Sequence, residues 1–414
     1  MKQRILVAVA CFALAALILL LRPLPPNGPD ASTGPTDTGH TNPNTTPPSN
    51  VTLPPENSTV RWYSCDESVR AFFAAVAADY TDLTGVEVVV MAPEEDGCQA
   101  SLQRYMESDE PPTVLCIHSQ SQLKSWKDSL LDLGNTGLAE MLCNDGLGMR
   151  LDGKLLGIPM AVDGYGLLMN AELLASKGAL SRNDIFDLPS LTTAVQILKN
   201  NSVKAFPTAS FTMQDAWHLL MGGDLDSARA FIDLYLANGN KSGNTMTLFL
   251  DGKSAFCLGG SWEYDTLASI TGSELHVRNL DILPHYAAGA MQYVCSTVWS
   301  VNAGASEDNI RATLHFLKWM VTAGEDTPAP VDRLEKLTVF ADSAWYGNQL
   351  EKKLRSYMQT EPAVLQWKET TTTGNRLLLA LTEYINDSNE TNWEAVCNTV
   401  DQVKSENGYT SLHN

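Results

Sequence analysis

The amino-acid sequence predicts an α/β protein built on an open, largely parallel sheet. Strand-type residues at 61–64 are followed by residues 67–82, where apolar side chains recur at helical spacing, and then by the β-branched run 86–91. This order is typical of a βαβ unit, and the continuous apolar run suits a strand buried on both faces. A further helical segment, 99–108, leads through two prolines into the apolar run 113–117. Strands and helices that alternate in this way predict the α/β class.

Later segments extend this alternation and then become mainly helical. Ser306 is expected to cap the helix 309–322, with Glu307 in its first turn, because a serine oxygen accepts a backbone N–H there and an acid suits the positive helix end. The remaining strands are expected at 155–159, 163–170, 253–262, 280–284 and 293–299, and the remaining helices at 191–200, 214–221 and 227–237.

Residues 1–22 predict a membrane anchor or signal segment. Lys2 and Arg4 precede seventeen uncharged residues, 5–21, which would span about 25 Å as a helix. The residues that follow provide no small-x-small cleavage site, so an uncleaved anchor is favoured. Cys11 loosely matches a lipoprotein cleavage box, and lipidation there is the alternative. Because the positive charges precede the segment, the rest of the chain is expected outside the cytoplasm.

Residues 23–58 predict a disordered tether. They are rich in Pro, Thr, Asn and Ser, and they hold ten of the 20 prolines of the chain. Such a segment has too few large apolar side chains to offset the entropy of ordering it. The globular part is therefore expected to begin at residue 59 and to be tethered at the extracellular face of a cell membrane.

The charge balance argues against one class of partner. The chain has 28 Lys and Arg against 48 Asp and Glu, a net charge of −20. Because nucleic acids are bound by basic patches, no nucleic-acid partner is expected.

The cysteines predict disulfides rather than a metal site. None of them forms a Cys-x-x-Cys pair, and oxidation is expected outside the cytoplasm. An odd number in the globular part leaves at least one unpaired. These seven are Cys65, Cys98, Cys116, Cys143, Cys257, Cys295 and Cys397.

Catalytic motifs are absent from the sequence. It contains no Gly-x-Ser-x-Gly, phosphate-binding loop, His-Glu-x-x-His or Gly-x-Gly-x-x-Gly string, and its seven histidines are scattered. No catalytic residue, metal ligand or cofactor is therefore assigned, and the protein is not expected to be an enzyme.

Several local strings, in their order, resemble a known family. Residues 112–114 read Pro-Thr-Val where that family commonly has Pro-Asp-Val, and Gly260-Ser261-Trp262 matches its Gly-x-Trp turn. The other strings lie at 73–88, 152–159, 165–170, 252–262 and 315–320. Together they resemble the bacterial extracellular solute-binding proteins of ABC importers, in particular the sugar-binding family 1. Thr113 in place of the usual acid, and an anchor in place of a cleaved lipoprotein signal, depart from the pattern.

This resemblance implies a two-lobed, periplasmic-binding-protein type II-like fold with an interlobe cleft and hinge strands. Lobe one would comprise residues 59–160 and 284–322, and lobe two residues 161–283 and 323–414. The implied function is capture of a carbohydrate in the cleft and delivery to an ABC permease in the membrane, by a monomer without cofactors. Hinge closure would let the ligand stabilise a closed state that the permease recognises.

Six residues are candidates for contact with the ligand. A sugar offers apolar faces to aromatic rings and hydroxyl edges to carboxylates and amides. Trp262 in the Gly-x-Trp turn is expected to stack on the sugar, and Asp163, four residues after Pro159, is expected to bind hydroxyl groups. For Trp262 the alternative is core packing, and for Asp163 a solvated turn. The lower-ranked candidates are Tyr165, Gln214, Trp217 and Trp345.

Two other functions remain open at the level of sequence. An anchor, a proline-rich stem and an outward domain also suit a type II membrane glycosyltransferase, with Asp224-Leu225-Asp226 as its metal site and seven Asn-x-Ser/Thr sequons. The two acids also suit a helix N-terminus, which is the simpler interpretation. Alternatively, the same binding fold serves a sensor rather than a transporter.

Overall fold

The structure is a computed structural model. The residues it describes are 54–55, 57–95, 97–178, 180–239, 245–270, 277–286, 289–344, 347–368, 371–407 and 409. The predicted anchor at 1–22 and almost all of the predicted tether at 23–58 lie outside these residues. Within the described part of the chain, no helix is both long and apolar enough to cross a membrane.

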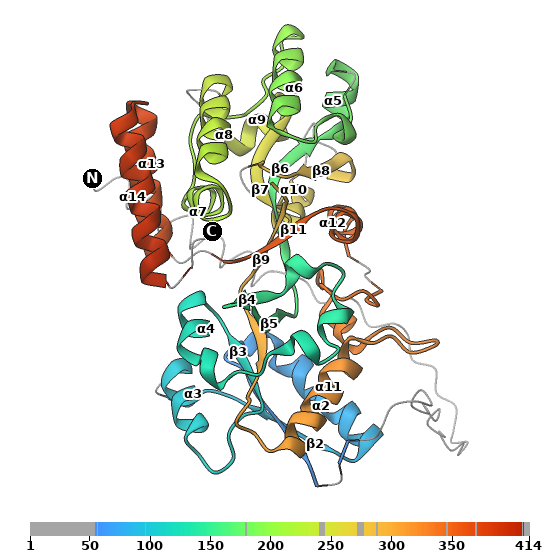
Figure 1. The fold of residues 1–414 in the computed structure, drawn as a ribbon. Helices are drawn as coiled ribbons and strands as arrows, with labels where there is room; N and C mark the ends of the chain where they lie inside the picture. The colour runs from blue at the N-terminus through green and yellow to red at the C-terminus, as the bar shows by residue number, and fades with distance from the viewer. Residues whose placement is uncertain are drawn as a thin grey trace, which may run out of the picture. The chain divides into compact units, whose positions relative to one another are not determined.

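A six-stranded sheet in the order β2-β1-β3-β10-β5-β4 forms the centre of the first lobe (Figure 1). Strands β1, β2 and β3 are parallel to one another, whereas β10 runs antiparallel to β3 and β5. The strands are β1 (Thr59–Tyr63), β2 (Glu87–Met91), β3 (Val114–Ile117), β4 (Met149–Leu151), β5 (Lys154–Pro159) and β10 (Val298–Val301). The helices are α2 (Arg70–Thr84), α3 (Cys98–Met106), α4 (Gln120–Trp126) and α11 (Glu307–Val321). The predicted βαβ start and the Ser306 cap of α11 are both present.

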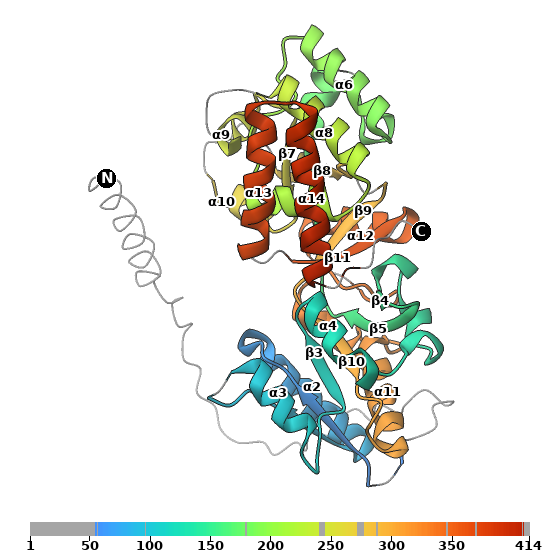
Figure 2. The same cartoon turned by 60° about the vertical axis from the view of Figure 1, so that its left-hand side comes forward.

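A second sheet in the order β11-β9-β6-β7, with β8 also paired to β6, forms the centre of the second lobe. Helices α13 and α14 lie side by side (Figure 2), and α13 also packs on α7. The strands are β6 (Asp163–Asn170), β7 (Phe256–Gly260), β8 (Leu280–Leu283), β9 (Met291–Cys295) and β11 (Ala363–Trp367). The helices are α5 (Ala171–Gly178), α6 (Leu188–Asn200), α7 (Met213–Met221), α8 (Leu225–Asn238), α9 (Thr245–Leu250), α10 (Glu263–Ser269), α12 (Gln349–Thr360), α13 (Thr371–Asn386) and α14 (Glu390–Asn407).

Strand β6 organises the core of the second lobe. Every residue of it after Asp163 is buried, which is typical of a strand covered on both faces. Alternate side chains enter two different clusters: Leu167 and Met169 pack with helices α6 to α8, and Leu168 packs on the opposite face. Gly166 lies directly against the carbonyl oxygen of Leu283, where a Cβ atom would collide with backbone.

The chain crosses between the two sheets three times. It passes from β5 to β6 after Pro159, from β9 to β10 through Ser296 and Thr297, and from the pairing of Phe340 with Leu142 to helix α12. The segment around Leu337 still belongs with the first lobe, because its carbonyl accepts a hydrogen bond from Val162.

Several details differ from the sequence prediction. The predicted strand 293–299 is two strands, β9 and β10, in different sheets. Strand β2, predicted to be buried on both faces, is a half-exposed edge strand, and β11 was not predicted at all. The predicted lobe boundary at 284 falls between β8 and β9, yet both pair with β6.

Candidate functional site

The order of the first three strands creates a crevice at one edge of the first sheet. Strand β1 lies between β2 and β3, so the chain moves to one side of β1 through α2 and returns past it through α3. Right-handed crossovers therefore place α2 and α3 on opposite faces of the sheet. In open α/β sheets, ligands bind outside the carboxyl ends of the strands at this kind of reversal.

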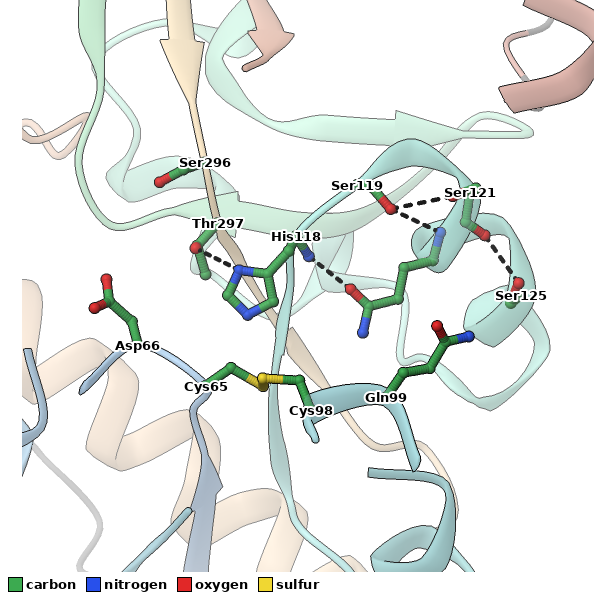
Figure 3. Close-up of a pocket in the computed structure, with 11 residues that line it drawn as sticks. Cys65, Asp66, Cys98, Gln99, His118, Ser119, Ser121, Ser125, Ser296 and Thr297 are labelled. Atoms are coloured by element: carbon green, nitrogen blue, oxygen red, sulfur yellow. Dashed lines mark hydrogen bonds between the residues drawn. A yellow bond between two sulfur atoms is a disulfide. The ribbon is translucent and has the colours of Figure 1, made fainter. Parts of the chain in front are cut away.

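A pocket of about 530 Å³ lies at this edge (Figure 3). Its walls come from the turn after β1, the start of α3, the end of β3 with the first turns of α4, and the crossing between β9 and β10. The lining residues are Cys65, Asp66, Cys98, Gln99, His118, Ser119, Ser121, Gln122, Ser125, Ser296 and Thr297.

The lining is polar but almost uncharged. Hydroxyl and amide groups predominate, Asp66 is the single carboxylate, and no lysine or arginine is among the lining residues. Hydroxyls and amides both donate and accept hydrogen bonds. Such a wall suits a ligand whose surface also mixes donors and acceptors, rather than an anion that needs cationic partners.

His118 ties the pocket to the crossing between the lobes. It follows β3, and its Nδ1 shares a hydrogen bond of 2.9 Å with the hydroxyl of Thr297. Its backbone N–H donates to Oε1 of Gln122 at 2.8 Å, which fixes the turn into α4. Burial lowers the pKa of the His118 imidazole, so the ring is neutral near pH 7.

Asp66 has two roles in the structure. It caps the short helix that follows it, because its Oδ1 accepts the backbone N–H of Ser68 at 2.9 Å. The same residue also lines the pocket. Cap and ligand contact are therefore compatible in one carboxylate.

The disulfides expected from the extracellular setting are represented by one bond, Cys65–Cys98, which also lines the pocket. Among the described residues, the other cysteines are free, and Cys116, Cys257 and Cys295 are buried. No group of three or more histidine, cysteine or acidic side chains in the described ranges is placed to hold a metal ion.

Two of the predicted ligand residues lie together in the second lobe. Asp163 opens β6, and its Oδ1 accepts the hydroxyl of Ser261 at 2.9 Å. Ser261 is followed by Trp262, which is half-buried and stacks on Tyr165 with ring centroids 6.1 Å apart. The Gly-x-Trp turn and the start of β6 thus form one surface near a crossing between the lobes.

The other predicted residues are placed differently. Tyr165 is fully buried, with its hydroxyl donating to Asp215 at 2.6 Å. Trp217 is 4% exposed in the core, and its Nε1 donates to the carbonyl of Trp367. Gln214 is half-buried on α7, and Trp345 lies outside the described residues. None of the predicted residues that the structure describes lines the pocket.

None of the pocket residues was predicted as a ligand contact. Ser119, Ser121 and Gln99 are common, uncharged residues that carry no motif. The signal that would have found them is topological: they follow strands that end at the reversal between β1 and β3.

The two sheets, the crossings between them and the pocket beside one of these crossings define a two-lobed α/β fold. A family model described as bacterial extracellular solute-binding protein matches residues 75–327. The chain therefore belongs to the bacterial extracellular solute-binding proteins. No curated protein sequence matches it significantly.

Solved structures of this class share the fold at low sequence identity. The bacterial solute receptor AcbH, described with an exclusive preference for β-D-galactopyranose, superimposes with a TM-score of 0.64 at 16% identity, covering 86% of this chain and 98% of its own. RafE from Streptococcus pneumoniae superimposes with a TM-score of 0.59 at 14% sequence identity, and the match covers 86% of this chain and 100% of RafE. A family 1 extracellular solute-binding protein from Bifidobacterium longum subsp. infantis superimposes with a TM-score of 0.60 at 13% sequence identity. The match covers 84% of this chain and 99% of that protein.

Proposed function

We propose that this protein is an extracellular receptor that binds a neutral carbohydrate and delivers it to an ABC permease. The observation that carries the proposal is the pocket lining, with its many hydroxyl and amide groups, one carboxylate and no cation. Sugar hydroxyls both donate and accept hydrogen bonds, and carboxylates make the strongest such contacts with them. The sugar preference of AcbH, which has the same fold, supports this ligand class.

The second lobe would complete the site when the lobes close on the ligand. The pocket wall contains no phenylalanine, tyrosine or tryptophan among its lining residues, although a sugar also has apolar faces. Trp262 supplies a half-buried indole backed by Tyr165, and Asp163 lies one strand away from the crossing that lines the pocket. We therefore assign stacking to Trp262 and a second set of hydroxyl contacts to Asp163.

The proposed partner is a permease reached from a membrane tether. Family membership places the receptor outside the cytoplasm, and residues 1–58 would hold it near the membrane as a monomer. A sensor partner is distinguished by transport: cells lacking the protein should lose uptake of the radiolabelled sugar and regain it with the wild-type gene. Uptake that persists at the wild-type level would favour the sensor.

The transferase alternative is not supported by its own motif. Asp224 accepts the backbone N–H of Ser227 at 2.7 Å and caps helix α8. An acid in that position has a structural role that needs no metal. We therefore propose that the ligand leaves the protein chemically unchanged.

Thermal-shift screening of the full-length protein tests the ligand class. The panel is D-galactose, maltose, raffinose, spermidine, a short peptide and inorganic phosphate, followed by calorimetry on each hit. A ligand at 100 times its Kd adds about 2.7 kcal/mol to stability, so a binding sugar should raise Tm measurably. Stabilisation by spermidine, peptide or phosphate alone, or Mn²⁺-dependent turnover of a nucleotide sugar, would overturn the proposal.

A further inference from the structure

We infer that the Cys65–Cys98 disulfide is a positioning element of the ligand pocket, which sets the separation of Asp66 and Gln99 before the ligand arrives. This inference rests on the proposed function. The bond joins the turn after β1 to the first residue of α3, with the two Cα atoms 5.7 Å apart. Each cysteine directly precedes one of the two polar residues, and all four line the pocket (Figure 3).

The two joined segments differ in how firmly the fold holds them. Asp66 follows a central strand, and its carboxylate is tied to the turn by the backbone and hydroxyl of Ser68. Gln99 is exposed at the start of α3, which follows the half-exposed edge strand β2 and Gly97, a glycine with φ of 89°. The disulfide therefore anchors the less restrained wall of the pocket to the more restrained one.

Preorganisation of this kind changes the affinity of the protein for its ligand but not the contacts that the bound ligand makes. If Gln99 occupies its binding position for only a fraction of the time, the apparent Kd rises by the inverse of that fraction. Ordering one polar side chain and its turn on binding corresponds to about a tenfold loss of affinity.

The fold provides a second restraint that keeps the inference testable. The hydroxyl of Tyr63 donates to the carbonyl of Cys98 at 2.6 Å, and β1 pairs with β2 over five residues. These contacts do not involve the sulfur–sulfur bond. A protein without the disulfide should therefore still fold, with α3 attached but its first turn less restrained.

The experiment measures sugar affinity in the full-length Cys65→Ser/Cys98→Ser variant. The probe is D-galactose, or raffinose if galactose gives no shift, and calorimetry is done at 15 °C. We expect Kd to rise about tenfold in this variant. The control Cys397→Ser removes a free cysteine of α14 and should leave Kd unchanged. Val76→Ala, which opens a cavity on α2, serves as the control for lowered stability alone.

A double-mutant cycle separates positioning from stabilisation. Gln99→Ala should weaken binding in the wild type and have a smaller effect without the disulfide, because the two changes act on one restraint. Purely additive effects, or an unchanged Kd in the double serine variant, would overturn the inference and leave the proposed function standing. Failure of the wild-type protein to bind any sugar would overturn the proposed function, and this inference with it.

Chemical reduction provides the reversible form of the test. A water-soluble phosphine breaks the sulfur–sulfur bond and is itself oxidised to the phosphine oxide, with oxygen and two protons taken from water, so that two thiols result. The reduced protein should match the double serine variant in Kd, and reoxidation should restore the original value. An unchanged Kd after complete reduction contradicts the inference.

Discussion

The pocket wall in the first lobe and the Asp163–Trp262 surface in the second lobe have opposite chemistry. The first is built from small hydroxyl and amide side chains at the ends of strands. The second presents an indole stacked on a buried tyrosine, with carboxylates nearby: burial raises the pKa of Glu351, and the charges of Asp163 and Asp265 add to this effect. A sugar needs both kinds of contact, hydrogen bonds at its edges and apolar packing on its faces. The division suggests that each lobe alone binds weakly and that affinity comes from both together.

The largest expected effect comes from removing the aromatic surface. Trp262→Ala should weaken sugar binding by about 2 kcal/mol, or about 30-fold in Kd, because one sugar face loses its apolar partner. Trp262→Phe should recover most of the loss. Trp393→Phe on α14 is the control, because this ring packs on Tyr384 and is not among the pocket residues. Calorimetry checks all three, and wild-type affinity in Trp262→Ala would remove this residue from the site.

A smaller effect is expected from the carboxylate of the first lobe. Asp66→Asn should raise Kd about tenfold, because a charged hydrogen bond to a hydroxyl becomes a neutral one. Asparagine caps helices as well as aspartate does, so Tm should not change. Asp224→Asn alters a similar cap on α8 and should affect neither quantity. A fall in Tm without a change in Kd would make Asp66 a cap only.

Glu351 tests the second surface through pH. Burial, with Asp163 and Asp265 nearby, raises the pKa of Glu351 to about 7. Because the folded-state pKa lies above that of the unfolded chain, stability is lost as pH rises from about 4.5 through 7. Glu351→Gln should therefore raise stability at pH 8 by about 1 kcal/mol after allowance for solvent screening, and not at pH 4. Equal Tm changes at both pH values would contradict the assignment.

The smallest expected effect concerns the link between pocket and crossing. Thr297→Val removes the hydrogen bond to His118 and should lower stability by about 1 kcal/mol, with Kd changed by less than about threefold. Thr297→Ser keeps the hydroxyl and serves as the control. Thermal unfolding and calorimetry measure the two effects. A larger loss of affinity than in Asp66→Asn would give Thr297 a direct part in binding.

The sequence predicts much of the fold because its strongest patterns are local. At the start of the globular part, the strands and the helix predicted from the spacing of apolar residues correspond to β1, α2 and β3. The strand 293–299 was predicted as one element because Ser296 and Thr297 carry no turn signal between two apolar runs. In the fold, the two halves of this segment, β9 and β10, pair in different sheets. The periodicity of apolar residues along the sequence carries no information about which sheet a strand joins.

The sequence nominates site residues only where they are chemically unusual. Trp262 and Asp163 were nominated because a tryptophan in a Gly-x-Trp turn and an acid in a crossing are distinctive, and their part in binding stays a prediction. The pocket wall was missed because serines and glutamines are equally common on any surface, and only the strand order brings them together. Tyr165 and Trp217 satisfied the aromatic pattern but lie in the core, because strand β6 is buried along its length after Asp163 and Trp217 lies on a buried part of helix α7.

The two-residue crossing at Ser296 and Thr297 makes the protein suitable as an optical reporter. Ser296 is exposed, lines the pocket and lies between strands of different sheets, so a change in the relative position of the two sheets would alter the surroundings of Ser296 at the pocket. A dye attached at Ser296→Cys would sense occupancy through its own surroundings. Labelling there is favoured because three of the five free cysteines of the described chain are buried.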